Sequence, residues 1–160
     1  MEMEEKMKGL EFLGLKDTIY KEKKPFKVYI AGKLDDNACN YIKNVHNMVK
    51  DAEEVRKSGF SVFVPGIDLI CGLINGDWNY KDYFDNSQPW LDVSDAVYVR
   101  GKDWNKSNGT LREIKRAEKK DIPIFFKEKN GLEKMITYFK INDIEEWAKE
   151  RGYWTHSIIR

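Results

Sequence analysis

The sequence predicts a three-layer α/β fold, in which helices cover both faces of a parallel sheet. Short apolar runs alternate with longer amphipathic stretches along the chain, and turn-forming residues separate the two kinds of segment. The chain has 160 residues, of which 41% are hydrophobic and 34% are charged, a composition typical of a globular domain. We therefore expect a single domain over residues 1–160.

Four short apolar runs are predicted strands. They are PFKVYIAG (25–32), FSVFVP (60–65), DAVYVRG (95–101) and IPIFF (122–126). Apolar residues recur at helical spacing between them, in residues 35–59 and 107–121. Because strands and helices alternate, the strands should be parallel and form a Rossmann-like (flavodoxin-like) sheet.

The remaining segments are less regular. Residues 66–77 hold three glycines and are predicted to be an irregular loop, whereas residues 78–94 should be partly helical, with Pro89 interrupting or restarting the helix. The tail predicts two helices, at 132–139 and 143–151. This divides the domain into an N-terminal arm (1–25), an α/β core (26–126) and a C-terminal helical extension (127–160).

Composition argues against several classes of partner. Lys and Arg total 28 against 27 Asp and Glu, a formal charge of +1, so neither a nucleic acid polymer nor an anionic membrane is expected. Cys39 and Cys71 lie far apart and only two histidines accompany them, so we expect no metal and no other cofactor. The acidic, weakly apolar N-terminus and the lack of a run of about 18 apolar residues favour a cytoplasmic protein.

The loop after the third strand carries the strongest candidate site, because ligands of parallel sheets bind beyond the carboxyl ends of the strands. If Ser107 caps the following helix, the free N–H groups of its first turn favour an anion. Gly109 lies four residues before Glu113 and leaves that helix face open. Glu113 is then either a partly desolvated nucleophile or a solvated carboxylate that pairs with Arg116.

The loop after the first strand offers a second wall for this site. Gly32 ends the strand and Lys33 precedes the next helix, an arrangement that suits a phosphate cradle. The same residues also fit an ordinary strand-to-helix turn.

Several motifs together resemble the nucleoside 2-deoxyribosyltransferase-like superfamily. They are KVYIAG at the first strand, Trp78, WLDVSDAVYV at the third strand, and W-x-x-S-x-G-T-x-x-E-x-x-x-A from Trp104 to Ala117. The resemblance covers residues 26–126. This superfamily includes deoxyribosyltransferases and 2′-deoxynucleoside 5′-monophosphate N-glycosidases. The resemblance implies that Glu113 attacks C1′ of the sugar, and that water or a second base resolves the resulting ester.

The resemblance also suggests roles for other residues. Tyr29 matches a family tyrosine near the nucleophile and is expected to orient it, although it also fits a core tyrosine. Ser107 stands where transferases acting on free nucleosides often carry an aspartate, and a serine accepts a 5′-phosphate more readily. Trp78 and Trp104 are candidate substrate contacts, and aromatic residues near Trp78 are either a base-stacking surface or core.

One position departs from the family pattern. Where the family usually has an acidic residue, this chain has Ser87, with Asp85 two residues earlier. Either Asp85 takes over that role in catalysis, with Ser87 contacting substrate, or the role is missing.

We therefore predict cleavage or transfer at the N-glycosidic bond of a (deoxy)nucleoside 5′-monophosphate. The alternatives are a nucleoside 2-deoxyribosyltransferase acting on free nucleosides, a ribonucleotide phosphoribohydrolase, and a non-catalytic nucleotide-binding module. Family sites borrow groups from a neighbouring subunit, so the resemblance also implies a homodimer or higher homo-oligomer.

Overall fold

The computed structural model describes residues 25–150, without the side chains of residue 141 and residues 144–150. The arm predicted at residues 1–25 therefore lies almost wholly outside the described residues, as does the end of the tail.

All four predicted strands are present and form one parallel sheet. They are β1 (Lys27–Ala31), β2 (Ser61–Phe63), β3 (Ala96–Val99) and β4 (Ile124–Phe126), in the order β2-β1-β3-β4. In this register Tyr29 lies beside Phe63 of β2 and Val97 of β3. From β1 the chain moves first to β2 on one side and then to β3 on the other, so the topological switch point lies between β1 and β3. Parallel sheets bind ligands at the carboxyl ends of the strands at such a point.

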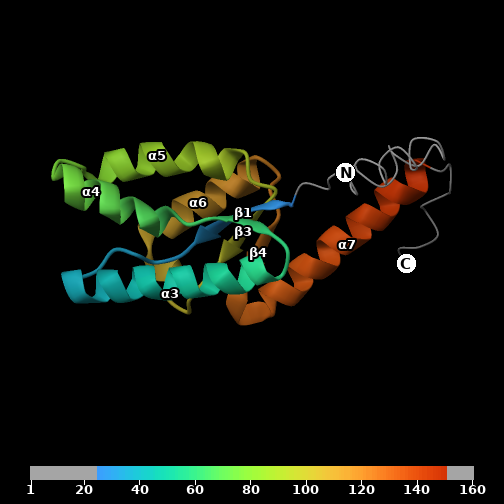
Figure 1. Ribbon diagram of the computed structural model, residues 1–160, viewed down its shortest axis with the longest axis horizontal. Coiled ribbons are helices and arrows are strands. Elements are labelled where there is room, and N and C mark those ends of the chain that lie inside the picture. The colour runs from blue at the N-terminus through green and yellow to red at the C-terminus, as the bar shows by residue number, and fades with distance from the viewer. Residues whose placement is uncertain (1–24, 151–160) are drawn as a thin grey trace, which may run out of the picture.

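Helices cover both faces of this sheet, as predicted (Figure 1). They are α3 (Ala38–Lys57), α4 (Leu69–Asn75), α5 (Tyr80–Asp92), α6 (Asn108–Lys119) and α7 (Gly131–Glu150), with 3₁₀ turns η1 (Pro65–Asp68), η2 (Trp104–Lys106) and η3 (Lys127–Lys129). Helices α3 and α7 pack on one face, and α5 and α6 pack on the other. The fold is thus a three-layer, Rossmann-like α/β architecture.

Three local predictions were wrong. Residues 66–77 are mostly η1 and α4 rather than an irregular loop, and α4 ends at Gly76, whose φ of 74° suits glycine. Helix α5 runs through Pro89 without a break, because its buried face continues on both sides of the proline. The tail forms one helix, α7, rather than two, and no glycine or proline separates its two halves.

The core has two halves because β1 alternates its side chains between the faces of the sheet. Val28 and Ile30 pack with residues of α3 and α7, whereas Tyr29 and Ala31 pack with residues of α5 and α6. Tyr29 and Ile30 are both fully buried. A tyrosine buried on the second face needs a partner for its hydroxyl group, and α6 supplies it.

A buried carboxylate ties the sheet to α3. Asp51, 7% exposed, accepts a hydrogen bond from Nε of Arg100 at 2.7 Å and pairs with Nζ of Lys127 at 2.5 Å. Arg100 follows β3 directly and Lys127 follows β4 directly. One side chain of α3 therefore fixes the carboxyl ends of two strands.

We expect Asp51→Asn to lower the free energy of unfolding by about 3 kcal/mol, because it leaves the largely buried Arg100 without its counter-charge, whereas Lys127 keeps Glu54 at 3.8 Å. Glu53→Gln is the matched control on the same helix. It breaks the exposed ion pair with Arg56 and should cost less than about 1 kcal/mol. Urea denaturation measures both, and equal losses would contradict the role given to Asp51.

Candidate functional site

The candidate site centres on a hydrogen bond between β1 and α6. The hydroxyl group of Tyr29 donates to Oε1 of Glu113 at 2.7 Å, across 84 residues of sequence. Tyr29 has no exposed surface, whereas Glu113 as a whole residue is only partly buried. A small ligand can therefore approach a carboxylate that bulk water hydrates poorly.

Burial sets the protonation states of this pair. Desolvation raises the pKa of Glu113 to about 7, although the hydrogen bond from Tyr29 acts in the opposite direction. Desolvation, together with the negative charge of Glu113, raises the pKa of Tyr29 well above its usual value. Tyr29 therefore remains a donor at neutral pH, while Glu113 divides between its ionised and protonated forms. A carboxylate with such a pKa is a stronger nucleophile than a hydrated one.

The start of α6 has the geometry that the sequence predicts. Ser107 is its N-cap residue, and its hydroxyl oxygen accepts from the backbone N–H of Thr110 at 3.3 Å. A Cβ atom built at Gly109 would lie 3.7 Å from the Tyr80 hydroxyl and 3.8 Å from Oγ of Ser107, so nothing crowds this position. The helix face between Ser107 and Glu113 is therefore open at its first turn.

The chain departs from the family pattern at Ser87 and Asp85, and of these two residues only Ser87 lies near the Tyr29–Glu113 pair. Ser87 is buried on α5, and hydrogen bonding with its hydroxyl group lowers the pKa of Tyr29 against the larger effect of burial. Asp85 is exposed and pairs with Lys81 instead. The Ser87 hydroxyl group itself donates to the backbone carbonyl of Phe84 at 3.3 Å, so α5 brings a neutral hydroxyl group, rather than the carboxylate of Asp85, near Tyr29.

Of the other predicted contacts, Gly32, Lys33 and Trp104 lie near the end of β3, whereas Trp78 lies beside α4 and α5. Lys33 pairs with Asp36 at 3.2 Å, and it lines a polar crevice together with Trp104. Gly32 is buried, and a Cβ atom there would meet Cγ of Arg100 at 2.7 Å, so glycine allows this close approach. Trp78 packs edge-on against Tyr83, with 5.1 Å between ring centroids.

The sequence did not predict that two polar side chains near the pair are buried without a hydrogen-bond partner in the part of the chain that the structure describes. The amide of Gln88 and the hydroxyl group of Thr110 have no hydrogen-bond partner among the described residues, although both side chains are almost fully buried. Thr110 lies one turn before Glu113, and Gln88 follows Ser87 on α5. A helical period carried through Pro89 would have placed Gln88 on the buried face.

Among the side chains that the structure describes, no three from histidine, cysteine, aspartate or glutamate lie close enough to hold a metal ion. Among the described helices, none has the length and apolarity needed to cross a membrane.

We expect Glu113→Gln to stabilise the protein at pH 8 by about 3 kcal/mol. The pKa of Glu113 rises from its ordinary value of 4.5 to about 7 on folding, so the folded protein binds the proton more tightly than the unfolded chain does. The contribution of Glu113 to stability is therefore lost as the pH rises through this range. The neutral amide removes that loss.

Urea denaturation at pH 5 and pH 8 checks this expectation. The advantage of Glu113→Gln should be small at pH 5, and Glu118→Gln, at an exposed position of α6, should show no such change. A variant with the same advantage at both pH values would contradict a desolvated Glu113.

Comparison with known proteins gives a family. The family described as "Domain of unknown function (DUF4406)" matches residues 26–126, which hold the sheet, α3 to α6 and the Tyr29–Glu113 pair. A comparison with curated proteins finds no match. Since the matched residues make up more than half of the chain, the protein belongs to the DUF4406 family.

Proposed function

We propose that this protein cleaves or transfers at the N-glycosidic bond of a (deoxy)nucleoside 5′-monophosphate, with Glu113 as the nucleophile. The observation that carries the proposal is the partly accessible Glu113 carboxylate, which is hydrogen-bonded to buried Tyr29 and has a pKa of about 7. A group with these properties, at the ligand-binding edge of a parallel sheet, is a candidate catalytic residue.

The chemistry follows from the pair. The free oxygen of ionised Glu113 attacks C1′ of the sugar, the bond from C1′ to the base breaks, and the base leaves with the bonding electrons and gains a proton. The Tyr29 hydroxyl group holds the other carboxylate oxygen and so fixes the direction of attack. Water, or a second base, then attacks C1′ of the ester and regenerates the carboxylate.

The first turn of α6 favours a phosphorylated substrate. Ser107 carries no charge, and the helix N-terminus favours an anion near Gly109, so a 5′-phosphate meets no repulsion there. An aspartate at position 107 would suit a free 5′-hydroxyl group instead. Such nucleotides occur in the cytoplasm, where we place the protein.

The second candidate is a nucleotide-binding module without turnover. Ser87 favours it, because the residue that contacts Tyr29 from α5 is a neutral hydroxyl group rather than an acid that could assist the leaving base. The two candidates differ in whether a bound nucleotide loses its base.

We expect the purified protein to release free base from a 2′-deoxynucleoside 5′-monophosphate, and Glu113→Gln to reduce that rate by at least about a thousandfold. Chromatography of the released base, over a panel of deoxyribonucleotides, ribonucleotides and free nucleosides, measures it. Because the attacking carboxylate must be ionised, kcat/KM should fall as the pH drops below about 7.

Glu118→Gln is the control for this assay, and it should release base at the wild-type rate. Release only from ribonucleotides, or only from free nucleosides, would favour the corresponding alternative enzyme. Nucleotide binding without release would favour the binding module, and unchanged release by Glu113→Gln would exclude Glu113 as the nucleophile.

We also propose a homo-oligomer in which α4 lies at the interface between subunits. Helix α4 exposes Ile70, Leu73 and Ile74, with exposed fractions of 57%, 72% and 78%. Aliphatic side chains this exposed on one short helix are typical of surfaces that a partner covers. The helix follows β2 through η1 and therefore lies at the same edge of the sheet as the candidate site.

Light scattering should give at least a dimer for the wild type and a monomer for the double variant Leu73→Glu/Ile74→Glu, because charges in an apolar interface are strongly unfavourable. Val93→Glu replaces an apolar residue of similar exposure, 53%, at the opposite edge of the sheet, and should stay oligomeric. A monomeric wild type would reject this proposal.

A further inference from the structure

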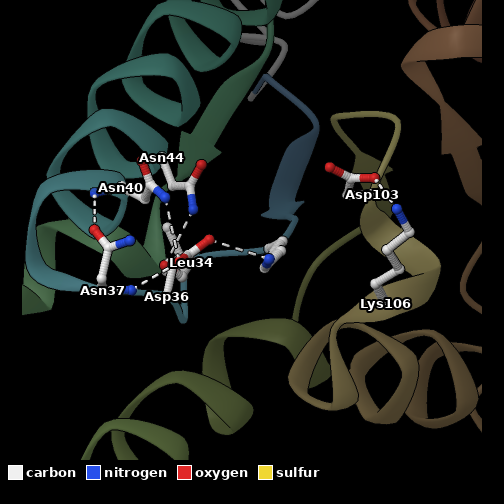
Figure 2. A network of polar contacts seen from close by, with 8 residues as sticks. Leu34, Asp36, Asn37, Asn40, Asn44, Asp103 and Lys106 are labelled. Carbon is white, nitrogen blue, oxygen red and sulfur yellow. Dashed lines mark hydrogen bonds and ion pairs between the residues drawn. The ribbon is translucent and has the colours of Figure 1, made fainter.

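A polar crevice lies at the carboxyl edge of the sheet, on the α3 side. It encloses about 300 Å³. Its walls are one face of α3 and the loop that follows β3, and Figure 2 shows Asn40 and Asn44 on the first wall and Asp103 on the second. Its lining is polar except for Trp104, and it includes the side chains of Lys43, Asn47, Arg100 and Lys102.

The crevice is separate from the Tyr29–Glu113 pair. One wall of the crevice is α3, which packs on the face of the sheet opposite Tyr29, whereas Trp104 on the other wall packs against the half of the core that contains Tyr29. Neither Tyr29 nor Glu113 lines the crevice, and Ser107 does not line it either. A ligand in it would therefore leave the proposed catalytic residues free.

Positive charge in the crevice exceeds negative charge. Lys33, Lys43, Arg100 and Lys102 face two carboxylates, and both carboxylates are already engaged. Asp36 pairs with Lys33 at 3.2 Å, and Asp103 pairs with Lys106 at 3.0 Å. In the described part of the chain, Lys43 and Lys102 have no ion-pair partner. Two cations are therefore available to a ligand.

Arg100 is a third cation of the crevice, and its side chain is fixed by the surrounding structure. Its Nε atom donates to buried Asp51, and its side chain is only 12% exposed. Gly32 gives it room, since a side chain at that position would collide with it. Its two Nη groups find no acceptor among the described residues, and such a fixed pair of donors suits a phosphate group.

The α3 wall presents hydrogen-bond acceptors. The amide nitrogen of Asn40 donates to Asp36 at 3.3 Å and that of Asn44 donates to the carbonyl group of Leu34 at 3.2 Å, as Figure 2 shows. Their Oδ1 atoms receive no hydrogen bond from the described residues, and neither does the amide of Asn47. Amide oxygens in this setting accept hydrogen bonds from hydroxyl groups.

We propose that this crevice binds a sugar phosphate. Lys43, Lys102 and the Nη groups of Arg100 hold the phosphate, and the amides of α3 hold the hydroxyl groups of the sugar. Trp104 is the one aromatic side chain that lines the crevice, and it packs against Phe126 with ring centroids 4.9 Å apart. The size and polarity of the crevice thus suit a sugar phosphate better than a nucleobase.

Calorimetric titration with ribose 5-phosphate at physiological salt tests the proposal. We expect saturable binding that the double variant Lys43→Gln/Lys102→Gln weakens by about tenfold or more, because it removes two charge-assisted contacts. The double variant Lys50→Gln/Lys115→Gln makes the same change in net charge at exposed positions outside the crevice and should bind as the wild type does. Unphosphorylated ribose should not bind.

Two further variants separate this site from the proposed catalytic one. Glu113→Gln should leave the binding of ribose 5-phosphate to the crevice unchanged, even if the protein releases no base from any nucleotide. Ser107→Asp should leave in place the binding step that depends on Lys43 and Lys102. The proposal is overturned if ribose 5-phosphate does not bind, if Lys43→Gln/Lys102→Gln binds it as tightly as the wild type, or if Ser107→Asp abolishes binding.

Discussion

The pairing of β1 with both β2 and β3 decides which side chains can meet in this protein. Because β1 is an inner strand with both faces covered, its residues alternate between two closed layers, and a shift of one residue would exchange them. The present register sends Tyr29 toward α6 and Ile30 toward α3. The hydrogen bond to Glu113 exists only in this register, and so does the apolar packing beneath α3.

Asp51, which is buried, and Glu113, which is partly buried, show how the surroundings of a carboxylate determine its role. Asp51 is neutralised by Arg100 and Lys127, so its charge is satisfied within the fold and serves to join α3 to two strands. Glu113 has the hydroxyl group of Tyr29 and no cation as a hydrogen-bond partner among the described residues. A carboxylate without a cationic partner is stabilised when positive charge develops beside it. Positive charge develops at C1′ of the sugar when the bond to the base breaks, so such a carboxylate suits that reaction.

The sequence predicted correctly those parts of the fold that depend on residues close together in the chain. The apolar runs and the period of α3 placed the strands and the parallel order, and the Ser107 cap placed the start of α6. Residues 66–77 were misjudged because their three glycines indicate turns, whereas only Gly76, which caps α4 with a φ of 74°, ends a helix there. Lys33 and Trp104 were assigned to the Glu113 site, and both also line the crevice, which the sequence did not predict because its two walls meet only in the folded chain.

The course of α7 separates the two ends of the molecule. Over its 20 residues the helix extends about 30 Å, and Figure 1 shows it running away from α4 and from the first turn of α3. The carboxyl end of α7 is thus remote from the edge where both candidate ligand sites open. Immobilisation through that end on a sensor surface would leave the Glu113 site and the crevice facing solution, so ligands of either could be measured on the same anchored protein.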